Sequence, residues 1–503
     1  MINSRTVLSF WPLLLGGLYP LGFAPFEYHT LLLLIIMAFV AGLQYHSNAF
    51  RFGFLFGLGL ASTGLSWIYV SIHAYGHIHP LIAAMITLLL LLYIALFYGL
   101  MAACQQRLSH RHHLLMRALL LASIWIGFEW ARAKLFGGFP WLLLGHAAID
   151  SPVQRLLPSI GIYGCGFIIC WLASSIYLGL REHGARQLSL CLPIIVLLSL
   201  QSYPHPSPTP SPKHFSTSII QANVAMLEKW DEAFFWKNYF YYLQSIKRLL
   251  TPHRLIILPE AAISAPNTYM RDELRRIDNM AKRQNSAVIL GIPQSATDND
   301  NYYNGSMALG QASGNYYKQQ LVPFGEYVPH LFLKLMQWLQ VPIVNTIPGP
   351  QHQAPIRIFK EQVASLICYE LAYPEILRPQ VLQSKLVITM SDDTWFGHSL
   401  ALYQHLQMAR TLAIMSHRSL VFANNNGLSS LISAEGKILS QAPLWQQHHI
   451  TAGLALYQDI STWVKWGDKP ILSICLLLWM LGLGQWLTDK KTFEESADLA
   501  IKT

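Results

Sequence analysis

Long apolar runs at both ends of the chain constrain its fold more than any other feature. A helix that crosses a bilayer needs about 20 mostly apolar residues. Candidate runs cover residues 7–25, 30–43, 52–71, 81–104, 114–130, 160–180, 188–200 and 471–487. Only 12% of the 503 residues are charged, and the mean hydropathy is +0.32. An average soluble protein carries about 25% charged residues. The sequence therefore predicts an integral-membrane α-helical bundle of about eight spans.

Basic residues in the connections predict how these spans are oriented, because Lys and Arg concentrate in the cytoplasmic loops of membrane proteins. If the spans alternate in direction, the connections on one side hold Arg5, Arg51, Arg107, Arg111, Arg117, Arg181, Arg186, Lys490 and Lys491. The connections on the other side hold Arg132, Lys134 and Arg155. The richer side is predicted to be cytoplasmic. Both chain ends then face the cytoplasm, and the region between the seventh and eighth spans lies on the opposite side.

The expected domain order follows from this pattern. Residues 1–201 form an N-terminal bundle of about seven spans, and residues 202–213 (SYPHPSPTPSPK) form a Pro/Ser-rich linker. Such a composition cannot pack a core and is typical of a semi-extended spacer. Residues 214–458 form an extramembrane domain, and residues 459–503 form a last transmembrane helix with a cytoplasmic tail.

The extramembrane region alternates short β-like runs with helix-like stretches. Strands are expected at residues 216–223, 254–259, 287–293, 304–309, 363–369, 385–391, 420–424 and 428–433, and helices at residues 231–250, 271–284 and 399–417. Runs of Val, Ile and Leu suit strands that are buried on both faces, which indicates a sheet covered by helices. The predicted fold is a layered α/β domain.

Three reactive side chains in this region stand at the ends of apolar runs. Cys368 is the only cysteine of the domain, since the other five of the six lie in or beside apolar spans. Glu260 ends the run LIILPE, and Lys318 lies in GNYYKQQLV. A charge that directly follows a buried strand is costly unless it meets a cleft or a partner. An inert buried thiol and solvated loop charges are the alternatives to a catalytic group.

The segments around these residues resemble the nitrilase superfamily. They are PEAA at residues 259–262, YYKQQLVPFGEYVP at residues 316–329 and ICYEL at residues 367–371. Members of that superfamily use a Glu-Lys-Cys triad in an αββα sandwich. With the spans on either side of the domain, the whole chain resembles the bacterial apolipoprotein N-acyltransferase family.

The resemblance implies a role for each candidate residue. Cys368 would be the nucleophile, Glu260 the general base, and Lys318 the group that stabilises the oxyanion, with the backbone N–H after Cys368 as a second donor. The supporting residues implied by the same resemblance are Glu326, Tyr369, Glu370 and Trp230. Three positions depart from the usual family pattern: Asp392 stands where Asn is common, Ser419 replaces a proline, and Phe422 replaces a second arginine.

The resemblance also implies a substrate and a location. The expected reaction is a phospholipid-dependent, two-step acyl transfer through a thioester on Cys368 to the α-amino group of a diacylglyceryl-cysteine lipoprotein, the last step of lipoprotein maturation. Phosphatidylethanolamine is the expected acyl donor. The expected location is the bacterial inner membrane, with the catalytic domain on the periplasmic side. No cofactor or metal is expected.

Other functions are less consistent with the residues. The net charge of +9 does not gather on one stripe, which argues against nucleic acid binding. The histidine clusters at residues 73–79 and 110–113 lack a helical His-Glu-x-x-His arrangement, which argues against a metal site. A membrane-tethered nitrilase-type amidase acting on a small amide is the main alternative. A non-enzymatic membrane receptor that keeps the fold is the third.

Overall fold

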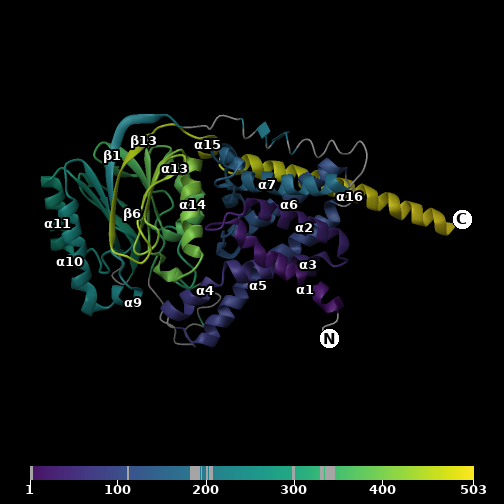
Figure 1. Ribbon diagram of the computed structural model, residues 1–503, viewed down its shortest axis with the longest axis horizontal. Helices are drawn as coiled ribbons and strands as arrows, with labels where there is room; N and C mark the ends of the chain where they lie inside the picture. The colour runs from purple at the N-terminus through teal and green to yellow at the C-terminus, as the bar shows by residue number, and fades with distance from the viewer. Residues whose placement is uncertain are drawn as a thin grey trace. The chain divides into compact units, whose positions relative to one another are not determined.

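The computed structural model describes residues 4–76, 78–109, 113–181, 208–296, 301–328 and 346–502, with a few isolated positions between them. The chain divides into two compact units. One consists of Met1–Ser66, Met85–His205 and Trp466–Thr503, and the other of Trp67–Ala84 and Pro206–Lys465. The first unit is helical, and the second contains both β-sheets of the described chain (Figure 1).

The helical unit is built from apolar helices that pack through small residues. Its main helices are α1 (Ser4–Leu18), α2 (His29–Tyr45), α3 (Ala49–Gly64), most of α5 (Pro80–Ser109), α6 (Leu114–Lys134), α7 (Leu157–Arg181) and α16 (Lys469–Lys502). A Cβ on Gly16 would lie 1.9 Å from the Phe56 carbonyl oxygen, and one on Gly59 equally close to that of Leu13. Helices α1 and α3 therefore approach so closely that only glycine fits at these positions.

Fewer membrane-spanning helices occur among the described residues than the eight predicted for the whole chain. Four helical stretches in the described residues are long and apolar enough to cross a membrane: Pro80–Ser109, Leu114–Gly137, Pro152–Arg181 and Lys469–Thr488. Ala49–Gly64 and Trp67–Tyr75 make a fifth if they count as one span bent by 51°. Helix α2 has only 17 residues, about 25 Å at the usual rise, which is short for a hydrocarbon core of about 30 Å. The expected run at residues 188–200 lies outside the described residues.

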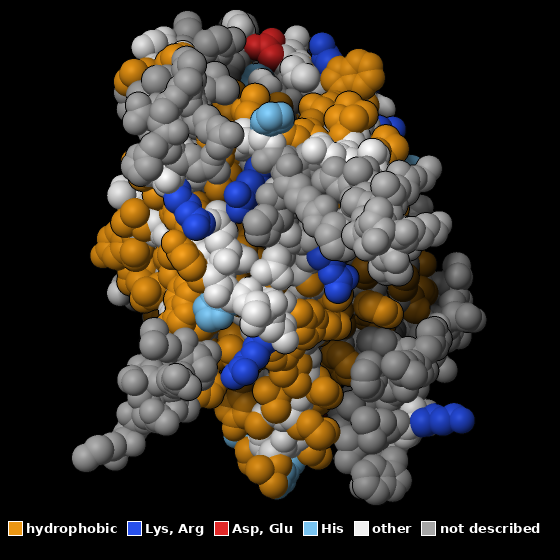
Figure 2. Space-filling view, turned by 90° about the vertical axis from the view of Figure 1, so that its right-hand side faces the viewer, with side chains coloured by type: hydrophobic (Ala, Val, Ile, Leu, Met, Phe, Trp, Pro, Cys, Tyr) orange, Lys and Arg blue, Asp and Glu red, His pale blue; other side chains and the backbone are white. Residues whose placement is uncertain are grey.

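Exposed apolar side chains on these helices fit contact with lipid. Leu81, Leu88 and Leu89 on α5 and Leu477 and Met480 on α16 are each about half exposed or more. Figure 2 shows hydrophobic side chains over much of the described surface on one face of the molecule, with separate Lys and Arg side chains among them. A soluble protein rarely exposes apolar area on this scale.

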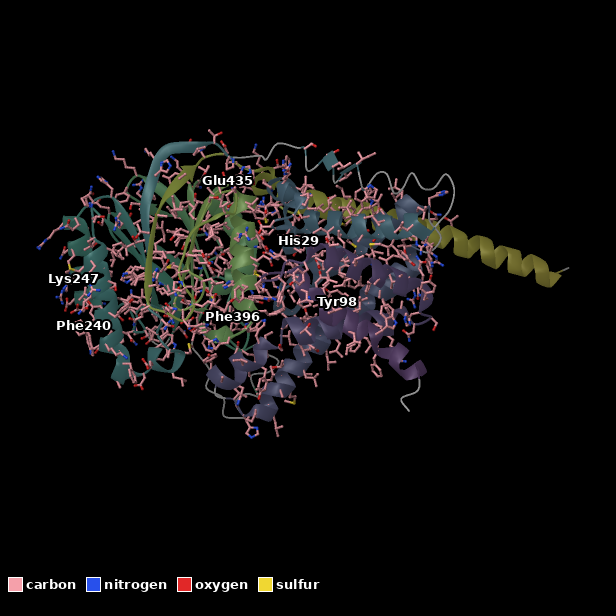
Figure 3. All side chains as sticks on the ribbon, viewed as in Figure 1. His29, Tyr98, Phe240, Lys247, Phe396 and Glu435 are labelled. Carbon is pink, nitrogen blue, oxygen red and sulfur yellow. The ribbon has the colours of Figure 1, made fainter. Side chains whose placement is uncertain are left out.

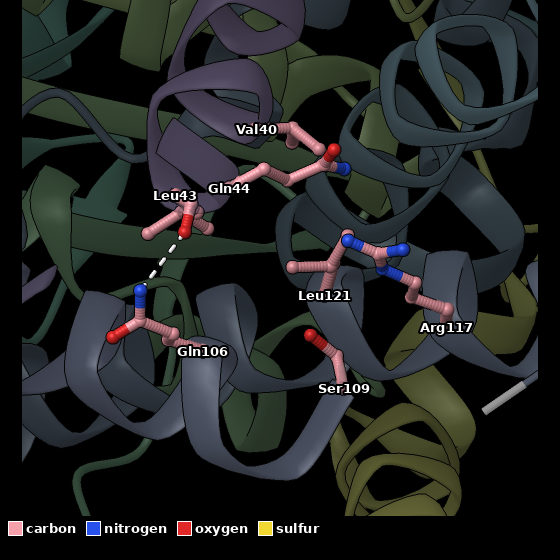
Figure 4. A pocket seen from close by; sticks show the side chains of 7 residues that line it. All are labelled: Val40, Leu43, Gln44, Gln106, Ser109, Arg117 and Leu121. Atoms are coloured by element: carbon pink, nitrogen blue, oxygen red, sulfur yellow. Dashed lines mark hydrogen bonds between the residues drawn. The ribbon is translucent and has the colours of Figure 1, made fainter. Parts of the chain in front are cut away.

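A small hollow lies within the helical unit. It is lined by side chains from α2, α5 and α6, namely Val40, Leu43, Gln44, Gln106, Ser109, Arg117 and Leu121 (Figure 4). Gln106 Nε2 donates to the Leu43 carbonyl at 3.0 Å. None of the candidate catalytic residues belongs to this hollow, so it is not the predicted site.

Two facing β-sheets form the second unit. One has the strand order β13-β1-β2-β3-β4-β6 and the other β12-β11-β10-β9-β8-β7-β5. The first sheet contains β1 (Pro210–Gln221), β2 (Arg254–Ile257), β3 (Ala287–Ser295), β4 (Tyr302–Gly310), β6 (Asn315–Tyr317) and β13 (His448–Tyr457). The second contains β5 (Ala312–Ser313), β7 (Ile356–Ile358), β8 (Glu361–Ile367), β9 (Leu386–Ser391), β10 (Ser419–Asn424), β11 (Ser430–Ile432) and β12 (Ile438–Gln441).

Helices cover the outer face of each sheet. Helices α10 (Glu232–Leu249) and α11 (Arg271–Arg283) bury Tyr242 and Ile277 against the first sheet. Helices α13 (Pro374–Val381) and α14 (Ala401–Ser416) pack on β8 and β10 of the second. The core between the sheets is formed by buried side chains such as Ile219 and Val363. The result is the αββα sandwich that the sequence predicts.

Most expected strands and helices occur within a few residues of their predicted bounds, but some elements were missed. Strand β1 begins at Pro210, inside the expected linker, because its early part pairs with β13 as far as Tyr457. Strand β13 itself was not predicted. Strand β6, which begins at Asn315, was not predicted either. These strands depend on partners distant in the chain, which local sequence patterns do not reveal.

One short segment between helical stretches belongs to the unit with the sandwich. It contains α4 (Trp67–Val70) and the π-helical turn Ser71–Tyr75. The Ser71 hydroxyl donates to the Trp395 carbonyl at 2.6 Å, and the rings of Trp67 and Phe396 meet edge to face with centroids 4.7 Å apart. This segment therefore supports the turn Asp393–Phe396, which follows strand β9.

Candidate active site

Cys368 lies at the end of a buried strand in a strained backbone conformation. Strand β8 ends at Ile367, and Cys368 opens the 3-10 turn Cys368–Ala372. Its φ angle is +51°, in the left-handed region that side chains other than glycine seldom adopt. The side chain is 8% exposed. Such strain often occurs at functional sites, where the surrounding structure holds the residue in place.

Glu260 and Lys318 form a buried ion pair. Glu260 follows β2, Lys318 directly follows β6, and both strands belong to the sheet opposite the one that carries Cys368. Lys318 Nζ lies 3.2 Å from Glu260 Oε1, and both side chains are buried. The second oxygen, Glu260 Oε2, accepts from the backbone N–H of Asp392 at 3.1 Å. The carboxylate is therefore held from two directions.

Glu326 and Asn304 complete the surroundings of this pair. Lys318 Nζ lies 2.9 Å from Glu326 Oε2. The Asn304 amide donates to both Glu260 Oε1 and Glu326 Oε1 at 2.7 Å, and so bridges the two carboxylates. Asn304 was not among the residues predicted for the site. It begins the strand expected at residues 304–309, and nothing in that local pattern marks it as a site residue.

The charges of Glu260 and Lys318 affect the pKa of the Cys368 thiol. Burial raises the pKa of the Cys368 thiol, the Glu260 carboxylate raises it further, and the Lys318 ammonium lowers it. Burial alone would lower the pKa of Lys318, but Glu260, Glu326 and Cys368 raise it above its usual value. Lys318 is therefore a permanent cation. The thiol is protonated in the resting site and needs a base in order to react.

Glu370 connects the nucleophile turn to the loop that carries Lys318. Its buried carboxylate accepts from the backbone N–H groups of Gln319 at 2.6 Å, Gln320 at 3.2 Å and Ile367 at 2.7 Å, and from the Tyr316 hydroxyl at 3.0 Å. Burial raises the pKa of Glu370 to about 7, although the backbone donors oppose that shift. The arrangement fixes the positions of Cys368 and Lys318 relative to one another.

The remaining two supporting residues are placed differently from each other. Tyr369 is buried, and its hydroxyl accepts from that of Tyr373 at 3.1 Å. Trp230 is 54% exposed and follows the short helix α9 (Met226–Lys229). The structure therefore brings Glu326 and Glu370 to the ion pair and the nucleophile, whereas it leaves Trp230 at the surface.

Asp392 is neutralised by a lysine that the sequence analysis did not single out. Lys229 Nζ forms a buried ion pair with Asp392 Oδ2 and donates to the Glu260 carbonyl at 2.8 Å. Asp392 Oδ1 also accepts from the Thr394 N–H and from the Asn425 amide, each at 3.2 Å. The charge of Asp392 is therefore compensated within the chain.

The other two residues expected to differ from the usual family pattern, Ser419 and Phe422, also fit their surroundings. The Ser419 hydroxyl donates to the Ala455 carbonyl at 2.8 Å, and Phe422 is fully buried on β10.

Among the described residues, no group of three His, Cys, Asp or Glu side chains has an arrangement that could hold a metal ion.

Family models match both parts of the chain. The model described as the apolipoprotein N-acyltransferase N-terminal domain matches residues 15–175, and the one described as carbon-nitrogen hydrolase matches residues 216–462. Among solved structures, a carbon-nitrogen hydrolase from Helicobacter pylori G27 aligns over 48% of this chain and 89% of its own length, with 15% identity and a TM-score of 0.37. The part of the second unit that the carbon-nitrogen hydrolase model matches is residues 216–462.

Relatives that span nearly the whole chain define the family more narrowly. The apolipoprotein N-acyltransferase of Coxiella burnetii is 31% identical, over 93% of this chain and 98% of its own length. Those of Pseudomonas syringae pv. tomato and Pseudomonas aeruginosa are both 33% identical and cover 93% and 96% of this chain, and 96% and 98% of their own lengths. The chain belongs to the apolipoprotein N-acyltransferase family.

Proposed function

We propose that this protein transfers an acyl chain from a phospholipid to the α-amino group of a diacylglyceryl-cysteine apolipoprotein, with Cys368, Glu260 and Lys318 as the catalytic triad. The observation that carries the proposal is the buried Lys318–Glu260 pair at 3.2 Å, whose charges act on the only thiol of the sandwich. A base, a fixed cation and a strained nucleophile together meet the requirements of covalent acyl transfer.

In the first half-reaction, Glu260 accepts the thiol proton as Cys368 Sγ attacks the sn-1 ester carbonyl of the phospholipid. Lys318 donates to the oxygen that becomes negative, a contribution of about 3–4 kcal/mol for one preorganised donor. The carbon–oxygen bond then breaks, and the leaving alkoxide receives the proton from Glu260. A lysophospholipid departs, and the acyl group remains on sulfur as a thioester.

In the second half-reaction, the neutral amine of the lipoprotein attacks the thioester carbonyl. Free α-amino groups have a pKa near 8, so a useful fraction is neutral near pH 7. Glu260 accepts a proton from the attacking nitrogen and returns it to the departing thiolate. The products are an amide and regenerated Cys368, so the cycle is of the ping-pong type.

The apolar helices support the proposed setting of this reaction, since a long-chain lipid substrate has to be drawn from a bilayer. We place the protein in the bacterial inner membrane, with residues 1–201 and 459–503 as its membrane parts and residues 214–458 as a periplasmic catalytic domain. Phosphatidylethanolamine is the proposed donor. The orientation rests on the distribution of Lys and Arg in the connections.

The test is to incubate the purified full-length protein with phosphatidylethanolamine that carries a radiolabelled sn-1 chain, and then with a diacylated lipopeptide. Wild type should form a hydroxylamine-sensitive acyl-enzyme, a lysophospholipid and an N-acylated peptide. Cys368→Ala should form none of them, whereas Cys165→Ala, which removes a buried thiol of the helical unit, should match wild type. An undiminished adduct in Cys368→Ala would reject the assigned nucleophile.

The same products separate this function from the amidase alternative. An amidase would release ammonia or a small amine from an amide and would leave the phospholipid intact. Mass analysis of the lipid fraction therefore decides between the two functions.

A further inference from the structure

A histidine–aspartate pair is buried directly behind the nucleophile and has no role in the mechanism above. His405 on α14 and Asp393 after β9 are both fully buried. His405 Nδ1 lies 2.9 Å from Asp393 Oδ1, and His405 Nε2 lies 3.2 Å from the backbone carbonyl oxygen of Cys368. The pair thus reaches the strained residue itself, through its main chain.

The hydrogen-bond partners of His405 determine how many protons its ring carries. A carboxylate oxygen and a carbonyl oxygen are both acceptors, whereas a neutral imidazole has one donor and one acceptor nitrogen. If Asp393 is ionised, a neutral ring therefore leaves one of the two contacts without a proton. Both contacts are satisfied at once when both ring nitrogens carry a proton, and the ring is then a cation.

The charge balance around Asp393 favours the same protonation state. Asp393 Oδ1 also accepts from the Ser391 hydroxyl at 2.7 Å, and the Asp393 N–H donates to the Asn424 side chain at 3.0 Å. Among the described residues, His405 provides the only ion pair of Asp393, and Asp393 Oδ2 has no hydrogen-bond partner. A buried carboxylate without a cation is strongly unfavourable.

Aromatic rings enclose the pair. Phe396 and Phe422 contact the His405 ring edge to face, with centroids 5.7 and 5.3 Å away. Phe396, which follows strand β9, is labelled in Figure 3, and Phe422 lies on β10. Because no arginine or lysine among the described residues pairs with Asp393, His405 is the side chain that can supply the compensating charge to an ionised Asp393.

We propose that Asp393 and His405 form a buried carboxylate–imidazolium pair that donates a charged hydrogen bond to the Cys368 carbonyl and so positions and polarises the nucleophile turn. The Cys368 carbonyl and the Tyr369 N–H belong to one peptide group. A cation bonded to the carbonyl oxygen strengthens the N–H as a donor, because hydrogen bonds in series polarise one another. That N–H is the second oxyanion donor expected beside Lys318. His405 is thus a positioning residue for acyl transfer, and the inference rests on the proposed function.

The protonation state is measurable without any activity. In full-length protein labelled with ¹⁵N-histidine and held in lipid nanodiscs, the imidazole nitrogens report how many protons each ring carries. At pH 8 an ordinary histidine, with a pKa of about 6.5, is neutral. One ring should still carry two protons at pH 8, and its signals should disappear in His405→Gln. A spectrum at pH 8 in which every ring is neutral would overturn the proposal.

Kinetics test the consequence for catalysis. Asp393→Asn removes the charge, yet its amide can donate to Nδ1, so a neutral ring still donates from Nε2 to the Cys368 carbonyl. The rate constant for acyl-enzyme formation at saturating phospholipid should fall about tenfold, with unchanged half-saturation and a near-native melting temperature. His405→Gln should show a similar fall, and the double variant should be no slower than the slower single variant.

A matched control separates positioning from stability. Ser416→Ala, which also alters a buried polar side chain on α14, should acylate at the wild-type rate. Acylation at the wild-type rate by Asp393→Asn would overturn the proposal. So would acylation rates that fall in proportion to the melting temperature across Asp393→Asn, His405→Gln and Ser416→Ala. If wild type forms no acyl-enzyme from phospholipid, the proposed function fails, whereas the ¹⁵N measurement still decides the protonation state.

Discussion

Replacing Lys229 by methionine removes one partner of the buried ion pair with Asp392. The two side chains are only 7% and 3% exposed, so water cannot solvate the carboxylate that is left. The substitution also removes the donor to the Glu260 carbonyl. Removing one member of a buried pair typically costs about 3–5 kcal/mol. For a domain of this size the melting temperature should fall by roughly 6–20 °C.

A double-mutant cycle isolates the contribution of the pair. Asp392→Asn should cost less than Lys229→Met, because the asparagine oxygen can still accept from Lys229, which donates to Oδ2 of Asp392, and Lys229 also keeps the Glu260 carbonyl as an acceptor. The double variant leaves no unpaired charge, so it should be more stable than the sum of the single effects predicts, by at least about 1 kcal/mol. Unfolding is followed by intrinsic tryptophan fluorescence during heating of the full-length protein in detergent.

An exposed lysine provides the control. Lys237 pairs with Glu228 at 3.4 Å, but its side chain is 68% exposed, so Lys237→Met should change stability by less than about 0.5 kcal/mol. If Lys229→Met were equally harmless, or if the single effects were additive, the pair would not stabilise the fold. The compensation of Asp392 described above would then be refuted.

Three further predictions concern the site. Glu260→Gln should speed alkylation of Cys368 at pH 8 by a small thiol reagent while it abolishes acyl transfer, because the carboxylate raises the thiol pKa; equal or slower alkylation would contradict this electrostatic account. Lys318→Met should slow the same alkylation, because the ammonium lowers that pKa, and a faster reaction would count against it. Asn304→Leu should reduce the acylation rate about tenfold, because Glu260 and Glu326 lose the amide between them, and wild-type kinetics would remove Asn304 from the site.

Local sequence patterns determined a large part of this architecture. The apolar runs predicted helices such as α5 and α6, since a run long enough to cross a bilayer is apolar along its whole length. Buried strands such as β8 and β9 were equally evident, because they are short and rich in Val, Ile and Leu. Fewer helices of the described residues qualify as spans than predicted, since helix α2, for example, is apolar but short for the hydrocarbon core.

The residues of the candidate site were likewise only partly evident from local sequence patterns. Cys368 and Glu260 stood out in the sequence because a reactive or charged side chain closely follows an apolar run, which is a local signal, whereas Lys318 was marked by the resemblance of its segment YYKQQLVPFGEYVP. Asn304 gave no comparable signal, since an Asn-Gly pair is also an ordinary turn.

The partners of the site residues were decided by the tertiary structure alone. Lys229 and Asp392 are 163 residues apart, and His405 reaches Cys368 from a different helix across 37 residues. Which charges meet depends on how two sheets pack face to face and where each strand ends in three dimensions. The sequence by itself determined which chemical groups the chain possesses, and the packing of the sandwich decided which of them neutralise one another.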